Sequence, residues 1–81
     1  MISKDSIETA YSFLHQKRNV YIHSSLHWQR DDIELAIMEY VGAMSPELYA
    51  AIAKDRQDFL RDHRRFQDDI TEAVTELEKM L

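Results

Sequence analysis

Cysteine is absent from this chain of 81 residues, which excludes two common ways of stabilising a small protein. Neither a disulfide framework nor a thiolate zinc site can form, and small secreted domains usually depend on one or the other. We therefore expect a cytoplasmic protein in a reducing compartment. A chain of this size buries only about 60 to 65% of the surface that its unfolded form exposes. We expect one domain, residues 1–81, of modest stability.

Turn-forming residues are almost as scarce as cysteine. Glycine and proline occur once each, at Gly42 and Pro46, in the single stretch VGAMSPEL. Tight β-hairpins usually need glycine or asparagine at positive φ, so a sheet protein fits this composition poorly. The predicted fold class is all-α.

Two further shortages bear on location and partners. The apolar runs are only a few residues long, and no basic region precedes an apolar stretch at the N-terminus, so we expect no signal peptide and no membrane span. Ten basic residues stand against 15 acidic ones, a formal charge of −5. This balance disfavours nucleic acid as a partner, because its binding depends on cations that neutralise phosphates. It favours a protein partner with a basic surface, or none at all. A helical partner is a separate alternative, because tyrosines at the edge of the core could line a groove for it.

The residues that are present form helical patterns, in which apolar positions recur at steps of three and four. The first pattern covers about 4–24 and starts near Ser3 or Asp5. Its end lies near 19 or near 24, because HQKRN at 15–19 offers cations and an asparagine suited to a helix C-terminus while the apolar stripe resumes beyond them.

A second helix is predicted over about 31–43, with Ser24 or Ser25 as the alternative start signal. Asp31 and Glu34 have the spacing of a capping box, with aspartate in place of serine or threonine. Leu26 and Trp28, just upstream, are expected to cover the connection between the first two helices.

The third helix is predicted over about 46–80, with Ser45 as its N-cap and Pro46 at its first position. At 1.5 Å per residue it would be about 50 Å long, whereas the first helix reaches at most about 30 Å. Its apolar stripe continues to the last residue, and soluble monomers rarely expose such a face. Either this helix bends near Arg61 to Arg65, or a second chain covers its far half. We predict a helical hairpin packed on a long third helix and completed as a helical-bundle or coiled-coil dimer.

Charge changes sign along the third helix: residues 54–65 carry a net charge of +2 and residues 68–79 carry −4. One interpretation is a solvated face with ion pairs four residues apart, such as Arg64 with Asp68 and Arg65 with Asp69. The other is a homodimer in which two copies cross antiparallel near Phe66, so that basic halves meet acidic halves. The predicted interface consists of Arg56, Phe59, His63, Phe66, Ile70, Val74, Glu76 and Leu77.

Groups that could carry chemistry are few. His23 and His27 lie four apart in HSSLH and could chelate a metal with Asp31, but the two intervening serines suggest a helix boundary that points the rings apart. His63 lies on the apolar stripe as a candidate pH-responsive interface residue, with a histidine that is merely hydrogen-bonded as the alternative. No glycine-flanked serine elbow or glycine-rich phosphate loop is present. We expect no catalytic residues, no cofactor and no metal ion.

These observations favour a small intracellular protein–protein interaction module, an adaptor, regulator or inhibitor that is not an enzyme. Its working surface would be the apolar, charge-segregated face of residues 56–80. The alternative is a small DNA-associated regulator in which the second and third helices form a helix-turn-helix-like pair around Gly42. Its reading segment, SPELYAAIAKD, would be apolar and acidic rather than basic.

Overall fold

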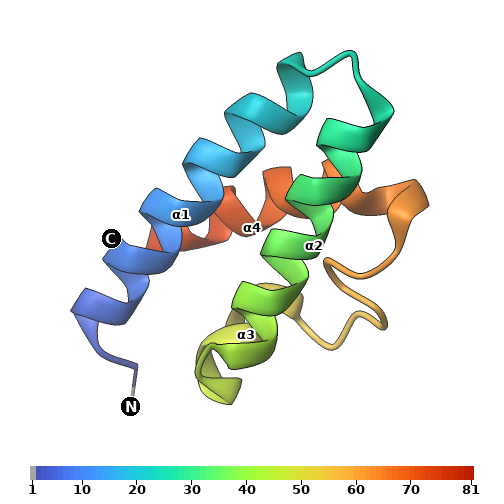
Figure 1. The fold of residues 1–81 in the computed structure, drawn as a ribbon. Helices are drawn as coiled ribbons and strands as arrows, with labels where there is room; N and C mark the ends of the chain where they lie inside the picture. Colours follow the sequence, from blue (N-terminus) through green and yellow to red (C-terminus); the bar gives the residue numbers. More distant parts are fainter. Residues whose placement is uncertain (1) are drawn as a thin grey trace.

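The computed structural model of the chain describes residues 2–81 and contains only helices and their connections (Figure 1). No strand occurs in this range, so the all-α prediction is confirmed. The elements in chain order are α1 (Lys4–His23), α2 (His27–Ala43), α3 (Pro46–Ala53), the short 3₁₀ helix η1 (His63–Arg65) and α4 (Phe66–Met80).

Helices α1 and α2 form an antiparallel hairpin (Figure 1). The start of α1 is confirmed, because the Ser3 hydroxyl oxygen caps the helix by accepting a hydrogen bond from the Ser6 N–H at 3.1 Å. Its end at His23 supports the longer of the two predicted ends. In the connection, the Ser24 hydroxyl donates to the Gln29 side chain at 2.6 Å.

The predicted start of α2 near Asp31 is wrong, since the helix begins at His27. Leu26 occupies the N-cap position, and its carbonyl accepts the first helical hydrogen bond from the Arg30 N–H at 3.1 Å. Asp31 therefore lies one turn inside the helix, and Glu34 turns toward the interior. Leu26 and Trp28 do not cover the connection as predicted, because both side chains are exposed.

A continuous helix over 46–80 is wrong, because residues 54–62 separate α3 from α4. The alternative left open, a break near Arg61 to Arg65, is the nearer of the two, although the break begins already at Lys54. Pro46 does occupy the start of α3, although the Ser45 side chain makes no capping bond. The helix ends where the backbone enters the left-handed region: φ is 52° at Lys54 and 65° at Asp55. Two further non-glycine residues, Asp58 and Leu60, also have positive φ, at 56° and 60°. These angles reverse the chain without glycine or proline.

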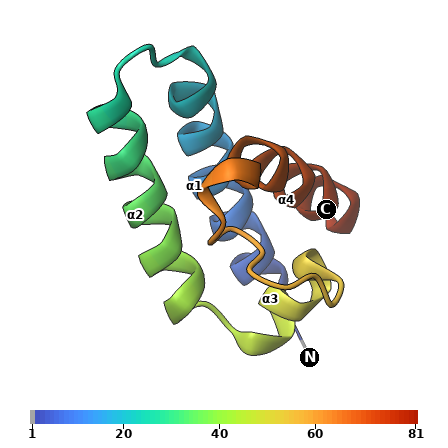
Figure 2. The same cartoon turned by 90° about the vertical axis from the view of Figure 1, so that its right-hand side faces the viewer.

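The reversal brings α4 back across α1. In Figure 2, α2 lies to one side of α1 and α4 to the other, and α4 packs mainly against α1. Tyr49 of α3 fixes the connecting segment by donating a hydrogen bond to the Phe59 carbonyl at 2.8 Å. All four α-helices and the segment between α3 and η1 contribute to one apolar core, whose largest fully buried side chains are Leu14, Ile37, Ile52, Phe59, Leu60, Phe66, Ile70 and Leu77.

The overhang expected from a 50 Å helix is therefore absent. Residues 2–81 extend over 38 × 23 × 19 Å along the principal axes, and the apolar stripe of α4 faces its own chain. No helix in this range is long and apolar enough to cross a membrane.

Candidate functional site

The apolar members of the predicted interface lie in the core of a single chain. Phe66 has no exposed surface, and Phe59, Ile70, Val74 and Leu77 are also buried. These side chains cannot form a docking surface while the chain keeps this fold. The physical reason for predicting a dimer, an apolar face without cover, therefore disappears.

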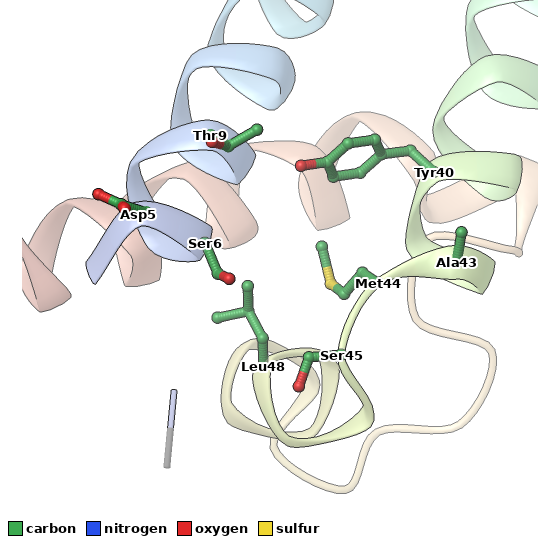
Figure 3. Close-up of a pocket in the computed structure, with 8 residues that line it drawn as sticks. All are labelled: Asp5, Ser6, Thr9, Tyr40, Ala43, Met44, Ser45 and Leu48. Atoms are coloured by element: carbon green, nitrogen blue, oxygen red, sulfur yellow. The ribbon is translucent and has the colours of Figure 1, made fainter. Parts of the chain in front are cut away.

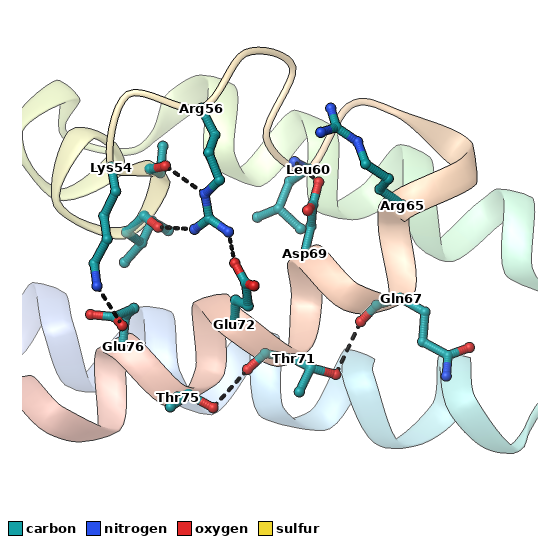
Figure 4. Close-up of polar contacts among 12 residues, drawn as sticks. Lys54, Arg56, Leu60, Arg65, Gln67, Asp69, Thr71, Glu72, Thr75 and Glu76 are labelled. Carbon is teal, nitrogen blue, oxygen red and sulfur yellow. Dashed lines mark hydrogen bonds and ion pairs between the residues drawn. The ribbon is translucent and has the colours of Figure 1, made fainter.

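The charged members of that interface pair within the chain (Figure 4). Lys54 Nζ lies 2.8 Å from Glu76 Oε1, Arg56 forms an ion pair with Glu72, and the Leu60 N–H donates to Asp69 Oδ2 at 3.0 Å. As the segment advances from 54 to 60, its partners on α4 recede from 76 to 69. The antiparallel match of basic and acidic stretches, predicted between two copies, is made inside one.

The ion pairs predicted along a solvated helix face are replaced by shorter-range contacts. Arg64 and Arg65 both approach Asp62, at 3.5 and 3.3 Å, while Asp69 serves the Leu60 amide. The hydrogen bond from Lys54, with the charges of Lys54 and Lys79, lowers the pKa of Glu76 below its ordinary value.

A cavity of about 380 Å³ opens between the start of α1, the end of α2 and the start of α3 (Figure 3). Its wall combines hydroxyl groups with apolar side chains, and it includes one carboxylate, that of Asp5. Among the lining residues in the described range 2–81, none has a cationic side chain and none is a histidine. The lining residues are Asp5, Ser6, Thr9, Tyr40, Ala43, Met44, Ser45 and Leu48.

A buried carboxylate joins α1, α2 and η1. Glu34 is 5% exposed, and its Oε2 accepts hydrogen bonds from Tyr21 Oη at 2.7 Å and, with His63 protonated on the ring nitrogen, from His63 Nδ1 at 2.8 Å. The hydrogen bond and the negative charge of Glu34 raise the pKa of His63. Burial, followed by the hydrogen bond to Glu34, raises the pKa of Tyr21. His63 therefore faces a carboxylate on α2, not an apolar stripe.

This cluster also contains the residues that could hold a metal ion. Asp31 precedes Glu34 by one turn of α2, and one ligand atom from each of Asp31, Glu34 and His63 lies within 4.8 Å of the other two. His23 and His27 are not part of this group: His23 ends α1, where its Nδ1 lies 2.8 Å from the Asn19 carbonyl oxygen, and His27 begins α2.

Sequence reasoning missed Glu34 because its partner His63 is 29 residues away. One signal was available. Glu34 lies among Ile33, Ile37 and Val41, the residues that form the buried face of α2. A carboxylate on the buried face of a helix needs hydrogen-bond donors from elsewhere in the fold.

The opposite face of α2 carries exposed apolar side chains. Trp28 is 63% exposed and Leu35 is 58% exposed. They are seven residues apart, which places them on one stripe of the helix, and Gly42 continues the stripe by another seven. A Cβ atom at Gly42 would meet nothing within 4 Å, so the backbone is open there. We call Trp28, Leu35 and Gly42, with the exposed carboxylates of Asp31, Asp32 and Glu39 beside them, the α2 outer face.

In comparisons with known proteins, no family model matches the chain, and neither a curated protein nor a solved structure is detectably similar to it.

Proposed function

We propose that this protein is a small intracellular protein–protein interaction module whose docking surface is the α2 outer face. The observation that supports it is the exposure of Trp28 and Leu35 on one stripe, away from the core. A second observation agrees with it: α2 has extensive contacts with α1 only, so its outward side is not covered by another element. Tryptophan is enriched among the residues that dominate binding energy at protein interfaces.

The partner proposed is an amphipathic helix with basic residues beside its apolar stripe. Apolar positions two turns apart fit the ridges and grooves of a second helix, a common mode of peptide recognition. Asp31 flanks one side of the stripe, and Asp32 and Glu39 flank the other. These carboxylates would attract lysine or arginine and repel an acidic helix. The open backbone at Gly42 would let the partner approach closely at that end.

This proposal keeps the class of function expected from the sequence and moves its surface from α4 to α2. The alternative of a DNA-reading pair gains no specific support. The sequence of α3, PELYAAIA, contains no lysine or arginine, and Lys54 and Arg56 just beyond it are paired with carboxylates of α4.

The proposal can be tested with designed peptides, because Trp28 is the single tryptophan and reports directly on the docking surface. One helical peptide would carry a leucine stripe flanked by lysine, and a matched peptide would carry glutamate in the lysine positions. We expect a saturable blue shift of Trp28 fluorescence with the lysine-flanked peptide and at least tenfold weaker binding of the glutamate-flanked one.

Two variants complete the test. Leu35→Ser should weaken binding of the lysine-flanked peptide at least tenfold, because it removes half of the apolar stripe. Leu81→Ser, which changes an exposed leucine outside α2, should bind like the unmodified chain. Equal binding of the two peptides, or an unchanged affinity in Leu35→Ser, would reject the α2 outer face as the docking surface.

A further inference from the structure

The group formed by Asp31, Glu34 and His63 supports an inference beyond the proposed docking function. We propose that these three residues bind one divalent first-row transition-metal ion, with Zn²⁺ as the reference ion. The site would link α2 to His63, the first residue of η1. It would therefore restrain the end of segment 54–62, which connects α3 to η1.

The spacing of the donor atoms fits a single ion. The ligand atoms of the three residues all lie within 4.8 Å of one another, and His63 Nδ1 lies 2.8 Å from Glu34 Oε2. A tetrahedral ion with bonds of about 2.1 Å keeps its ligands about 3.4 Å apart. The three donor atoms need to change their mutual separations by at most about 1.4 Å to share one ion.

The donor set selects the chemical class of the ion. One imidazole nitrogen with two carboxylate oxygens suits Zn²⁺ or another borderline first-row divalent ion. Three protein ligands leave one position of a tetrahedral ion for water. His63 is largely exposed, so an ion can enter from solvent.

The surrounding residues hold the central ligand in place. Glu34 is buried, and the Tyr21 hydroxyl donates to its Oε2 at 2.7 Å. Tyr21 is itself fixed, because the Arg30 guanidinium lies 4.7 Å above its ring and Arg30 Nε donates to its carbonyl at 3.2 Å. Outer hydrogen bonds of this kind orient metal ligands, and their removal typically lowers metal affinity about 10- to 100-fold.

The experiment uses the untagged chain of residues 1–81 after treatment with a chelator. Calorimetric titration with Zn²⁺ should give one equivalent bound, and Co²⁺ should produce a visible absorption band that Zn²⁺ removes. Both His63→Gln and Asp31→Asn should lower the Zn²⁺ affinity at least tenfold. Asp31 is exposed, so its variant keeps the core intact even if a change at Glu34 or His63 impairs folding. Tyr21→Phe should lower the affinity about tenfold, since it removes the outer hydrogen bond.

The matched control is a double variant, His23→Gln with His27→Gln, which removes the two histidines at the ends of α1 and α2 where they connect, and it should bind Zn²⁺ like the unmodified chain. A dissociation constant above about 1 mM for the unmodified chain would overturn the proposal. So would an affinity that is unchanged in both His63→Gln and Asp31→Asn, or one that is lost in the histidine double variant. Leu35→Ser should retain Zn²⁺ binding, which separates failure of this site from failure of the α2 outer face.

Discussion

Glu34 is a carboxylate buried among apolar residues of α2, and such a group requires hydrogen-bond donors from the rest of the fold. Its burial is tolerated because Tyr21 and His63 supply hydrogen bonds from two other elements. Burying a charge without such partners would cost several kcal/mol. The residue therefore links local composition to tertiary structure, because it is acceptable in α2 only when α1 and η1 are in place.

Tyr21→Phe should destabilise the chain by about 1 to 3 kcal/mol, because it removes one donor and leaves the buried carboxylate less well satisfied. Urea unfolding measures the change. In Glu34→Gln, where the acceptor is neutral, the same tyrosine substitution should cost less, so the double-mutant cycle should give a clear coupling energy. Equal costs in the two backgrounds would show that the hydroxyl does not serve Glu34.

Glu76 gives a prediction about pH. Its pKa lies below the ordinary value because the charged form is held by Lys54 and Lys79. A lowered pKa means that the stabilisation is present above the unfolded-state pKa and is lost as pH falls through the folded-state pKa. Glu76→Gln should therefore lower the urea midpoint at pH 7 and have little effect at pH 2. The difference at pH 7 should shrink in 1 M salt, since the pair is exposed. A difference that persists at pH 2 would contradict the ion pair as its cause.

At the scale of elements, the segment 54–62 decides the fold. It turns the chain through left-handed conformations at four residues that are not glycine. Asp62 then starts η1, where its carboxylate accepts a hydrogen bond from the Arg64 N–H at 3.0 Å. Aspartate tolerates the left-handed region better than most residues, because its short polar side chain can bond locally.

Substitutions at Asp55 distinguish this turn from the continuous helix expected from the sequence. In the left-handed turn, with φ of 65°, alanine should be less stable than glycine by about 1 kcal/mol. In a helix the order reverses, and alanine is more stable than glycine by about 1 kcal/mol. The free energies of unfolding of Asp55→Ala and Asp55→Gly measure the order. Ala50→Gly within α3 is the matched control and should destabilise the chain by about 1 kcal/mol.

The elements that the sequence predicted well are those defined by local signals. Ser3 marks the start of α1, Pro46 marks the start of α3, and the apolar period carries α4 to its end. The break after Ala53 could not be read from glycine or proline, because neither is used there. Its faint signal is the repetition of aspartate at 55, 58 and 62 inside an otherwise helical pattern. The start of α2 was misplaced because the spacing of Asp31 and Glu34 fits a capping box. In the structure, Glu34 instead accepts hydrogen bonds from Tyr21 and His63, which are distant in the sequence.

The candidate sites also depend on contacts between residues distant in the sequence, and local sequence patterns do not predict such contacts. Exposure of Trp28 depends on where α2 begins, and the group around Glu34 depends on the reversal at 54–62. The sequence did indicate that basic and acidic stretches should meet antiparallel. It could not decide whether they meet within a chain or between chains, because charge complementarity is the same in both cases.

At the scale of the whole molecule, the burial of the core within one chain leads to two expectations: a large loss of stability when a core residue is truncated, and a monomeric mass in solution. Phe66 is completely buried and lies 5.7 Å from the Tyr21 ring, so Phe66→Ala should cost about 3 to 5 kcal/mol. That is a large part of the stability of a domain of this size, which is about 4 to 12 kcal/mol.

Because all of this burial is within one chain, the thermal midpoint should not depend on protein concentration between about 1 and 100 μM, as it would for an obligate dimer. Sedimentation over the same range should give 9.6 kDa. A midpoint that rises with concentration, together with a doubled mass, would support the homodimer predicted from the sequence, in which two chains pair through the α4 segment. It would also mean that Phe66 is buried between chains instead of within one.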